Sequence, residues 1–364
     1  MHKFKKKAVP LFLLLIIALT LQTGCSNVLY ISKLGWHQAH ITYHSIPVQE
    51  VLDDPHVDRG VQEKIRFIQE VKQYGEEHLG LRQTESYSRF YEVSGPILYV
   101  VTASEKDQLK LYAWTFPIVG KVTYKGFFTK EEALKEQRKL DERGYDTYLQ
   151  PSMAYSTLGW FKDPIFSSIL KWDHGILANL ILHEMTHATV YLKGKTDFNE
   201  QMATFIGNQG AIDFLKEKYG AESKEPLKAV QSQEDDLLFS RWIDQAYERL
   251  SNLYALKIPR EEKLERRKEI FRSLQEEFIK MRSQFKTDGY LTFDQTPLNN
   301  AVLLAHRQYF HRLETFERLY RYLGQDLQKV VALMKKIQAS GEEPSAYLDR
   351  WMNEQGFTVS SFLR

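Results

Sequence analysis

The spacing of hydrophobic and polar positions changes along the chain and divides it into segments. Residues 26–95 have mainly helical periodicity, interrupted by polar stretches with glycine or proline such as LDDPHVDRG. Residues 96–158 have β-branched and aromatic runs on both sides of a charged helix, which we expect to begin after the N-cap Thr129 and to stop at Gly144. From residue 172 the pattern is helical almost to the end. These patterns predict a mainly α-helical α+β protein with a small β-α-β insert.

Residues 224–286 carry a second, purely structural pattern. Apolar residues recur at three- and four-residue spacing on both sides of Pro259: Phe239, Ile243, Ala246, Leu250 and Leu253 before it, and Leu264, Phe271, Leu274, Phe278 and Met281 after it. The pattern predicts an antiparallel helical hairpin with a solvated charged face. A coiled coil that binds a partner is the alternative, although the heptad pattern is short.

The first 25 residues have the three parts of a secretory signal. Lysines precede an apolar run over residues 8–21, which is short for a membrane span, and the segment closes on Cys25. Cys25 is the only cysteine in the chain and resembles the lipidated residue of a bacterial lipobox, although Gln22 stands where leucine is usual. We expect residues 1–24 to be a lipoprotein signal peptide, with Cys25 anchoring the protein to the membrane of the cell envelope. An uncleaved anchor and a plain secreted protein are the alternatives.

Composition and charge exclude some classes of protein. Of the 364 residues, 43% are hydrophobic and 26% charged, which supplies a large folded core. The formal net charge of +2 provides no basic excess for a phosphate backbone, so nucleic acid is not an expected partner. With a single cysteine no intrachain disulfide can form, and the stability of the fold must come from its core.

The motif HEMTH provides the candidate chemistry. His183 and His187 are four residues apart in an apolar stretch, so on a helix both imidazoles can face one ion while Glu184 lies beside it. Metal-assisted hydrolysis uses this arrangement, in which two imidazoles hold Zn²⁺ and the adjacent carboxylate accepts a proton from the attacking water. The alternative is an amphipathic helix whose polar residues face solvent.

A catalytic zinc site needs a third protein ligand, for which Glu200 is the candidate. If Gly194 ends the first helix, extended residues 194–199 are long enough to bring Glu200 back to the ion. The alternative is a capping box, in which Asp197 and Glu200 only satisfy backbone amides at the start of the next helix. We favour the ligand, because the two histidines would otherwise lack a carboxylate. Asn199 either orients the site or caps the helix.

Taken together, the H-E-x-x-H and N-E-x-x-A elements resemble those of the predicted bacterial aminopeptidase family, lipoprotein-type gluzincin-like zinc metallopeptidases. The resemblance extends through LYISKLGWHQAHI, FPIVGKVTYKGFF, AYSTLGWFKDPIFSSIL and PLNNAVLLAHRQYFHRLETFERL. It implies a zincin-like helical body and one zinc ion bound by His183, His187 and Glu200, with Glu184 as the base. The sequence lacks the Gly-x-Met-Glu-Asn segment with which well-studied aminopeptidases capture a free amine, so terminal and internal cleavage both stay open.

Other residues are candidates for binding substrate. Tyr309 is the preferred donor to the negative charge that develops on the carbonyl oxygen, with His306 and His311 flanking it. The segment AYSTLGWFKDP is a candidate edge strand for an extended peptide, and Tyr155 or Asp163 would line that cleft or build a turn. The spaced histidines at positions 37, 40 and 44 have no neighbouring carboxylate pattern, so we interpret them as ordinary polar residues of a helix.

We therefore expect residues 25–364 to form a single metallopeptidase-like domain. Its expected parts are a helical N-terminal part (26–95), a small α/β part (96–158), metal-binding helices (172–220), a helical hairpin (224–286) and C-terminal helices (296–357). The expected function is zinc-dependent hydrolysis of peptides outside the cytoplasm. The alternative is a non-hydrolytic, lipid-anchored envelope protein with a structural or vestigial zinc site and a helical partner-binding surface. The retained Glu184 and the open fourth metal position favour the enzyme.

Overall fold

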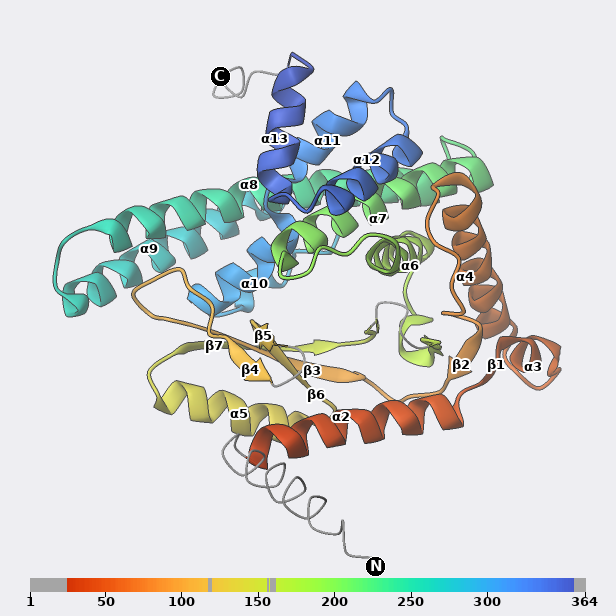
Figure 1. Ribbon diagram of the computed structural model, residues 1–364, viewed down its shortest axis with the longest axis horizontal. Coiled ribbons are helices and arrows are strands. Elements are labelled where there is room, and N and C mark those ends of the chain that lie inside the picture. The colour runs from red at the N-terminus through yellow and green to blue at the C-terminus, as the bar shows by residue number, and fades with distance from the viewer. Residues whose placement is uncertain (1–24, 117–119, 156, 158–161, 357–364) are drawn as a thin grey trace, which may run out of the picture.

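The helices of the chain are arranged in layers around a small sheet. The computed structural model describes residues 25–116, 120–155, 157 and 162–356 (Figure 1). The helices are α2 (Cys25–His44), α3 (Val48–Asp53), α4 (Arg59–His78), α5 (Lys130–Glu142), α6 (His174–Thr189), α7 (Thr196–Tyr219), α8 (Lys224–Ala255), α9 (Arg260–Met281), α10 (Asn300–Phe310), α11 (Leu313–Tyr322), α12 (Leu327–Ser340) and α13 (Pro344–Glu354). The predicted mainly helical α+β class is confirmed.

The strands are short and form three small sheets. They are β1 (Ile46–Pro47), β2 (Arg89–Tyr91), β3 (Leu98–Ser104), β4 (Trp114–Phe116), β5 (Gly120–Val122), β6 (Tyr124–Phe127), β7 (Asp146–Ser152) and β8 (Ile165–Phe166). The main sheet has the order β6-β3-β7 and is antiparallel, while β1-β2-β8 and β4-β5 make the other two. The insert (residues 96–158) thus contains more and shorter strands than the sequence indicated.

The helix of the insert begins and ends where the sequence predicts. Thr129 is the N-cap of α5, and its hydroxyl accepts a hydrogen bond from the main-chain N of Glu132 at 3.4 Å. Gly144, just beyond the end of the helix, has a positive φ of 84°, a conformation that glycine adopts without strain. In Figure 1, α5 and α2 lie below the main sheet, and α10 lies above it.

The main core lies between α6 and the helices around it. Leu177, Ile181 and Leu182 of α6 are fully buried among residues of α4, α7 and the C-terminal helices, which form the upper layers in Figure 1. Gly207 of α7 allows the two central helices to approach closely, because a Cβ there would lie 2.9 Å from the carbonyl O of Asn179 and 3.2 Å from the Cβ of His183. The packing of α7 on α6 is therefore tight beside a histidine of the predicted metal site.

The predicted helical hairpin is present as α8 and α9, with Pro259 as the N-cap residue of α9. Phe239 from α8 and Phe278 from α9 are fully buried in a separate core cluster and meet edge to face, with ring centroids 6.2 Å apart. The apolar pattern found in the sequence is the face that joins these two helices.

The predicted signal peptide, residues 1–24, lies outside the described residues. The described chain begins at Cys25, the first residue of α2. In the part of the chain that the structure describes, no helix combines the length and the apolarity that a membrane crossing requires.

Candidate metal centre

The helix that carries the HEMTH motif, α6, is held in place by its cap and by its apolar residues. Asp173 is the N-cap, and its side chain accepts a hydrogen bond from the main-chain N of Ile176 at 2.9 Å. The helix ends at Thr189, five residues before Gly194, so the prediction that Gly194 ends it is wrong. Val190 turns extended and places its side chain in the main core, which a continuing helix would prevent.

The start of α7 also differs from the prediction. Its N-cap residue is Lys195, whose side chain makes no capping bond, and Asp197 lies within the first turn. The capping-box alternative is therefore wrong. Asn199 does not cap the helix either, because its side chain bonds to Leu192 in the preceding loop. This tether folds the loop back so that Glu200 faces α6.

His183, His187 and Glu200 converge, and we call these three residues the triad. The two Nε2 atoms are 3.1 Å apart, and each lies 3.3 Å from Oε2 of Glu200. One donor atom from each residue lies within 4.8 Å of the others, an arrangement that could hold a metal ion. The three side chains are mostly buried, and imidazole nitrogen with carboxylate oxygen is a common donor set for transition metals.

The triad residues shift one another's pKa values. Burial alone would raise the pKa of Glu200, yet the hydrogen bonds from His183 and His187 outweigh it and lower the pKa to about 2. Burial, the largest effect, lowers the pKa of His187, but the hydrogen bond to Glu200 and the charges of Glu200 and Glu184 together outweigh it and raise the pKa. The opposite ring nitrogen of His187, Nδ1, is buried with no hydrogen-bond partner in the described structure, so packing orients this ring.

Glu184 and Tyr309, the two predicted catalytic residues, lie beside the triad. Glu184 follows His183 on α6 and is half-buried. The ring of Tyr309, from α10, lies 6.3 Å from that of His183 at an interplanar angle of 28°. Burial, followed by the charges of Glu200 and Glu184, raises the pKa of the Tyr309 hydroxyl well above its usual value. The hydroxyl therefore keeps its proton at neutral pH and is available as a donor.

Two further tyrosines of the site were missed by the sequence analysis. Tyr87 is buried with a positive φ of 63°, a strained conformation for a residue with a side chain. Burial, and after it the charge of Glu184, raises its pKa. Tyr124, from β6, has 45% of its surface exposed, yet burial of its hydroxyl end and the charge of Glu200 raise its pKa to about 12. No local sequence pattern indicates either residue.

The remaining predicted residues lie elsewhere. Tyr155 donates a hydrogen bond to Gln38 of α2 and packs near Phe166, and no contact described in the structure joins it to the triad. Asp163 builds a turn, because its carboxylate accepts hydrogen bonds from the main-chain N and the hydroxyl of Thr157. The centre of the predicted edge strand, residues 158–161, falls outside the described residues.

The two histidines that flank Tyr309, His306 and His311, contact residues outside the triad. Burial lowers the pKa of His306 to about 4, and its ring meets Phe293 edge to face with centroids 5.1 Å apart. His311 lies 2.7 Å from Asp244, measured from Nδ1 to Oδ1. The histidines of α2 are partly or fully exposed on that helix, as expected for ordinary polar residues.

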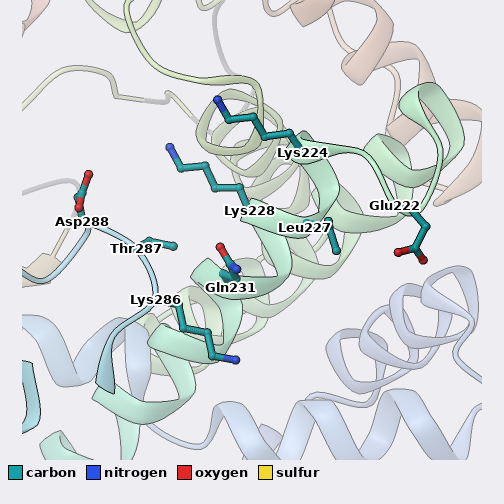
Figure 2. Close-up of a pocket in the computed structure, with 8 residues that line it drawn as sticks. All are labelled: Glu222, Lys224, Leu227, Lys228, Gln231, Lys286, Thr287 and Asp288. Atoms are coloured by element: carbon teal, nitrogen blue, oxygen red, sulfur yellow. The ribbon is translucent and has the colours of Figure 1, made fainter. Parts of the chain in front are cut away.

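Two cavities lie at the surface, one at the start of α7 and one at the start of α8. A cavity of about 470 Å³ is lined by residues 194–198 and Gln201 at the start of α7 together with the C-terminal end of α10, and no triad residue lines it. A more open hollow of about 540 Å³ lies where the start of α8 meets residues 286–288, and no triad residue lines it. Figure 2 shows Lys224 and Lys228 projecting in the same direction there, as exposed lysines of a helix do.

The fold and the site define a class of protein: a mainly helical α+β chain in which two consecutive helices assemble a triad suited to a metal ion. The chain belongs to the family described as "Putative aminopeptidase", whose family model matches residues 29–347. Membership of this family indicates a peptidase function. No curated protein and no solved structure matches the chain.

Proposed function

We propose that the protein is a zinc-dependent peptidase acting outside the cytoplasm, with His183, His187 and Glu200 as the metal ligands. The observation that carries the proposal is the spacing of the donor atoms. Ligands at 2.0–2.1 Å from zinc and at tetrahedral angles lie about 3.3 Å from one another. The donor separations in the triad are 3.1, 3.3 and 3.3 Å. The geometry thus fits zinc without rearrangement of the helices.

The number of donors supports a catalytic site. Structural zinc sites have four protein ligands, whereas catalytic sites have three and leave one position open. The group found among the described residues contains three donors. When bound, zinc supplies a Lewis acid that polarises the substrate carbonyl and acidifies a water.

The neighbouring side chains supply the proton transfers and the charge stabilisation. Glu184 lies next to a ligand on α6, where its carboxylate accepts the proton of the attacking water and later gives it to the leaving nitrogen. Tyr309 keeps its hydroxyl proton and donates a hydrogen bond to the oxygen that becomes negative. The family supports peptides as the substrate class.

The Glu184→Gln variant tests this function, because it removes the base and leaves the ligands in place. We expect the purified variant to bind one zinc ion and to lose peptide hydrolysis by at least about 100-fold. Zinc content is measured by elemental analysis, and cleavage by mass spectrometry of a digested peptide library. The matched control is Glu63→Gln, which neutralises an exposed glutamate of α4. Cleavage by Glu184→Gln at the parent rate would overturn the proposal.

We propose in addition that Cys25 carries a lipid that holds the protein on a membrane of the cell envelope. The position of this cysteine after the signal-like segment supports the proposal, and so do Trp36 and Tyr43 of α2, which are 72% and 84% exposed. Tryptophan and tyrosine are enriched where proteins meet the membrane interface. We expect Cys25→Ser to move the protein from the membrane fraction to the soluble fraction. A variant that stays with the membrane would rule out lipidation as the anchor.

A further inference from the structure

A row of hydrogen bonds crosses from α6 to α8 one helical turn from the triad. The side-chain nitrogen of Asn179 on α6 donates to Oδ1 of Asn208 on α7. Nδ2 of Asn208 in turn donates to Oδ2 of Asp236 on α8 at 2.7 Å. The hydroxyl of Tyr290 donates to the other carboxylate oxygen, Oδ1, at 2.6 Å. We call these four side chains the polar network.

The polar network lies next to a metal ligand on both helices that carry the triad. Asn179 precedes His183 by four residues, and residues four apart on a helix are neighbours on its surface. Asn208 follows Gly207, where a Cβ would lie 3.2 Å from the Cβ of His183. The network therefore joins α6 and α7 within one turn of the metal site.

Asp236 sets the direction of the hydrogen bonds in the polar network. Burial, the largest effect, raises the pKa of its carboxyl to about 6, so at pH 8 the group is ionised and can only accept. Asn208 must therefore present its nitrogen to Asp236 and its oxygen to Asn179. Asn179 in turn must present its nitrogen to Asn208.

This direction leaves the amide oxygen of Asn179 free to bind a ligand. No donor bonds to it among the described residues, and the side chain is partly exposed on the face of α6 that carries His183. An amide oxygen is an acceptor, and the backbone of a peptide offers one N–H donor for nearly every residue. The free oxygen beside a metal ligand therefore fits the main chain of a bound peptide.

We propose that Asn179 accepts a hydrogen bond from a main-chain N–H of the substrate, and that Asp236 positions it through Asn208. This inference rests on the proposed peptidase function and identifies a substrate contact away from the metal. Four residues of helix rise about 6 Å, which is the length of about two residues of extended chain. The bound N–H therefore lies about two residues from the bond that is cleaved. Asn179 binds substrate, whereas Asp236 and Asn208 are positioning residues.

Asp236→Asn tests the proposal, because it reverses the polar network with almost no change in side-chain shape. The new amide donates to Asn208, whose own amide turns over, and Asn179 then presents its nitrogen to the substrate. Every buried atom of the network stays paired. The other arrangement, in which the new amide donates to Tyr290, would leave a buried phenol proton unpaired and is therefore disfavoured.

The double exchange Asp236→Asn/Asn208→Asp restores the original direction. The carboxylate now lies one place closer to α6 and accepts from Asn179 on one side and from the new amide on the other. The hydroxyl of Tyr290 donates to the oxygen of that amide. Asn179 again presents its oxygen to the substrate, so a loss caused by the single change should be reversed.

Binding is measured in zinc-loaded Glu184→Gln protein, which lacks the catalytic base. Hexaalanine is titrated by calorimetry at pH 8 into this protein and into the same protein with each change. We expect Asp236→Asn to weaken binding about 10-fold and the double exchange to restore it to within about threefold. Glu248→Gln, which neutralises an exposed carboxylate of α8, should leave the affinity unchanged. Zinc content and thermal unfolding of each protein are measured alongside.

A second probe tests the contact with the substrate directly. Hexaalanines in which one peptide bond is replaced by an ester lack one N–H donor. In the Glu184→Gln protein one of these esters should bind about 10-fold more weakly than hexaalanine. In Glu184→Gln/Asn179→Ala that difference should disappear, because the acceptor is gone. This comparison carries the test alone if Asp236→Asn does not fold.

Unchanged affinity in Asp236→Asn would overturn the inference, and so would a double exchange that folds and binds zinc but does not restore binding. The absence of hexaalanine binding at millimolar concentration would overturn it too. An ester series whose affinities do not depend on Asn179 would limit the polar network to holding α6, α7 and α8 together.

Hydrolysis by proteins that retain Glu184 separates this inference from the proposed function. We expect Asp236→Asn to raise KM and to leave kcat nearly unchanged, because the contact is equally strong before and during the reaction. A parent that cleaves peptides, with a KM that Asp236→Asn does not alter, is a peptidase without this contact. A parent that cleaves none, although hexaalanine affinity follows the direction of the network, has the binding site without the proposed reaction.

Discussion

Asn199 and Leu192 are joined by two hydrogen bonds between a side chain and a main chain. The main-chain N of Leu192 donates to Oδ1 of Asn199 at 2.9 Å, and Nδ2 of Asn199 donates to the main-chain O of Leu192 at 2.9 Å. Both residues are buried, so the amide satisfies two polar groups that water does not reach. The pair fixes the loop between α6 and α7 immediately before Glu200.

Replacing Asn199 by alanine should destabilise the protein and weaken metal binding. The variant leaves the N–H and C=O of Leu192 unpaired, at a cost of about 1–3 kcal/mol for each buried group. Thermal unfolding and zinc titration of the parent and the variant measure the two effects. The control is Asn353→Ala, at an exposed position of α13, where little change is expected. Unchanged stability in Asn199→Ala would mean that the loop is held by its apolar residues alone.

Replacing Gly207 by alanine should separate α6 and α7, the two helices that carry the triad. The added methyl would lie 2.9 Å from the carbonyl O of Asn179, and a backbone atom cannot move aside cheaply. We expect a loss of about 1–3 kcal/mol in the free energy of unfolding and weaker zinc binding, because His183 is the next contact. Chemical denaturation and zinc titration measure both. Gly35→Ala on α2, where a Cβ meets nothing within 4 Å, should be neutral or slightly stabilising.

Zinc binding should release a proton whose amount depends on pH. The pKa of His187 is raised, because the hydrogen bond to Glu200 and the charges of Glu200 and Glu184 together outweigh the effect of burial. Below that pKa a metal ion must displace the imidazole proton. Proton release should therefore be larger near pH 6.5, the usual pKa of histidine, than about two units above it, and zinc affinity should rise with pH and then level off. Calorimetry in two buffers with different ionisation enthalpies measures the number of protons. An equal number at both pH values would contradict the coupling.

Replacing Tyr309 by phenylalanine should lower kcat by about 100- to 1,000-fold and leave zinc affinity unchanged. The ring that packs 6.3 Å from His183 is retained, while the hydroxyl donor is lost. Steady-state kinetics on a peptide cleaved by the parent measures the effect. Tyr124→Phe is the informative comparison, because its hydroxyl also lies near Glu200. If Tyr124→Phe loses activity and Tyr309→Phe does not, the donor comes from β6 instead of α10.

The sequence predicted the parts of the site that depend on local geometry. The four-residue spacing of His183 and His187 places both on one face of any helix, and the apolar stretch around them predicts that the helix is buried. The α8–α9 hairpin was predictable for the same reason, since its contact face is a run of regularly spaced residues.

What the sequence analysis could not predict is decided by packing between distant segments. The end of α6 depends on the burial of Val190, and the entry to α7 depends on the side chain of Asn199, so reasoning from glycine and capping preferences placed both boundaries wrongly. Tyr87 has a positive φ, a backbone conformation that no local residue pattern encodes. The cavity lined by residues 194–198 and Gln201 also takes residues from α10 and α13, which lie far from α7 in the sequence.

All three residues of the triad come from consecutive helices, and only a short loop separates His187 from Glu200. Closing a short loop costs little chain entropy, and local contacts form quickly during folding. The α6–α7 pair can therefore assemble around a metal ion before the sheet and the C-terminal helices have docked. If the proposed metal ion binds at this stage, it would link the two helices early and so shorten the search for the compact state.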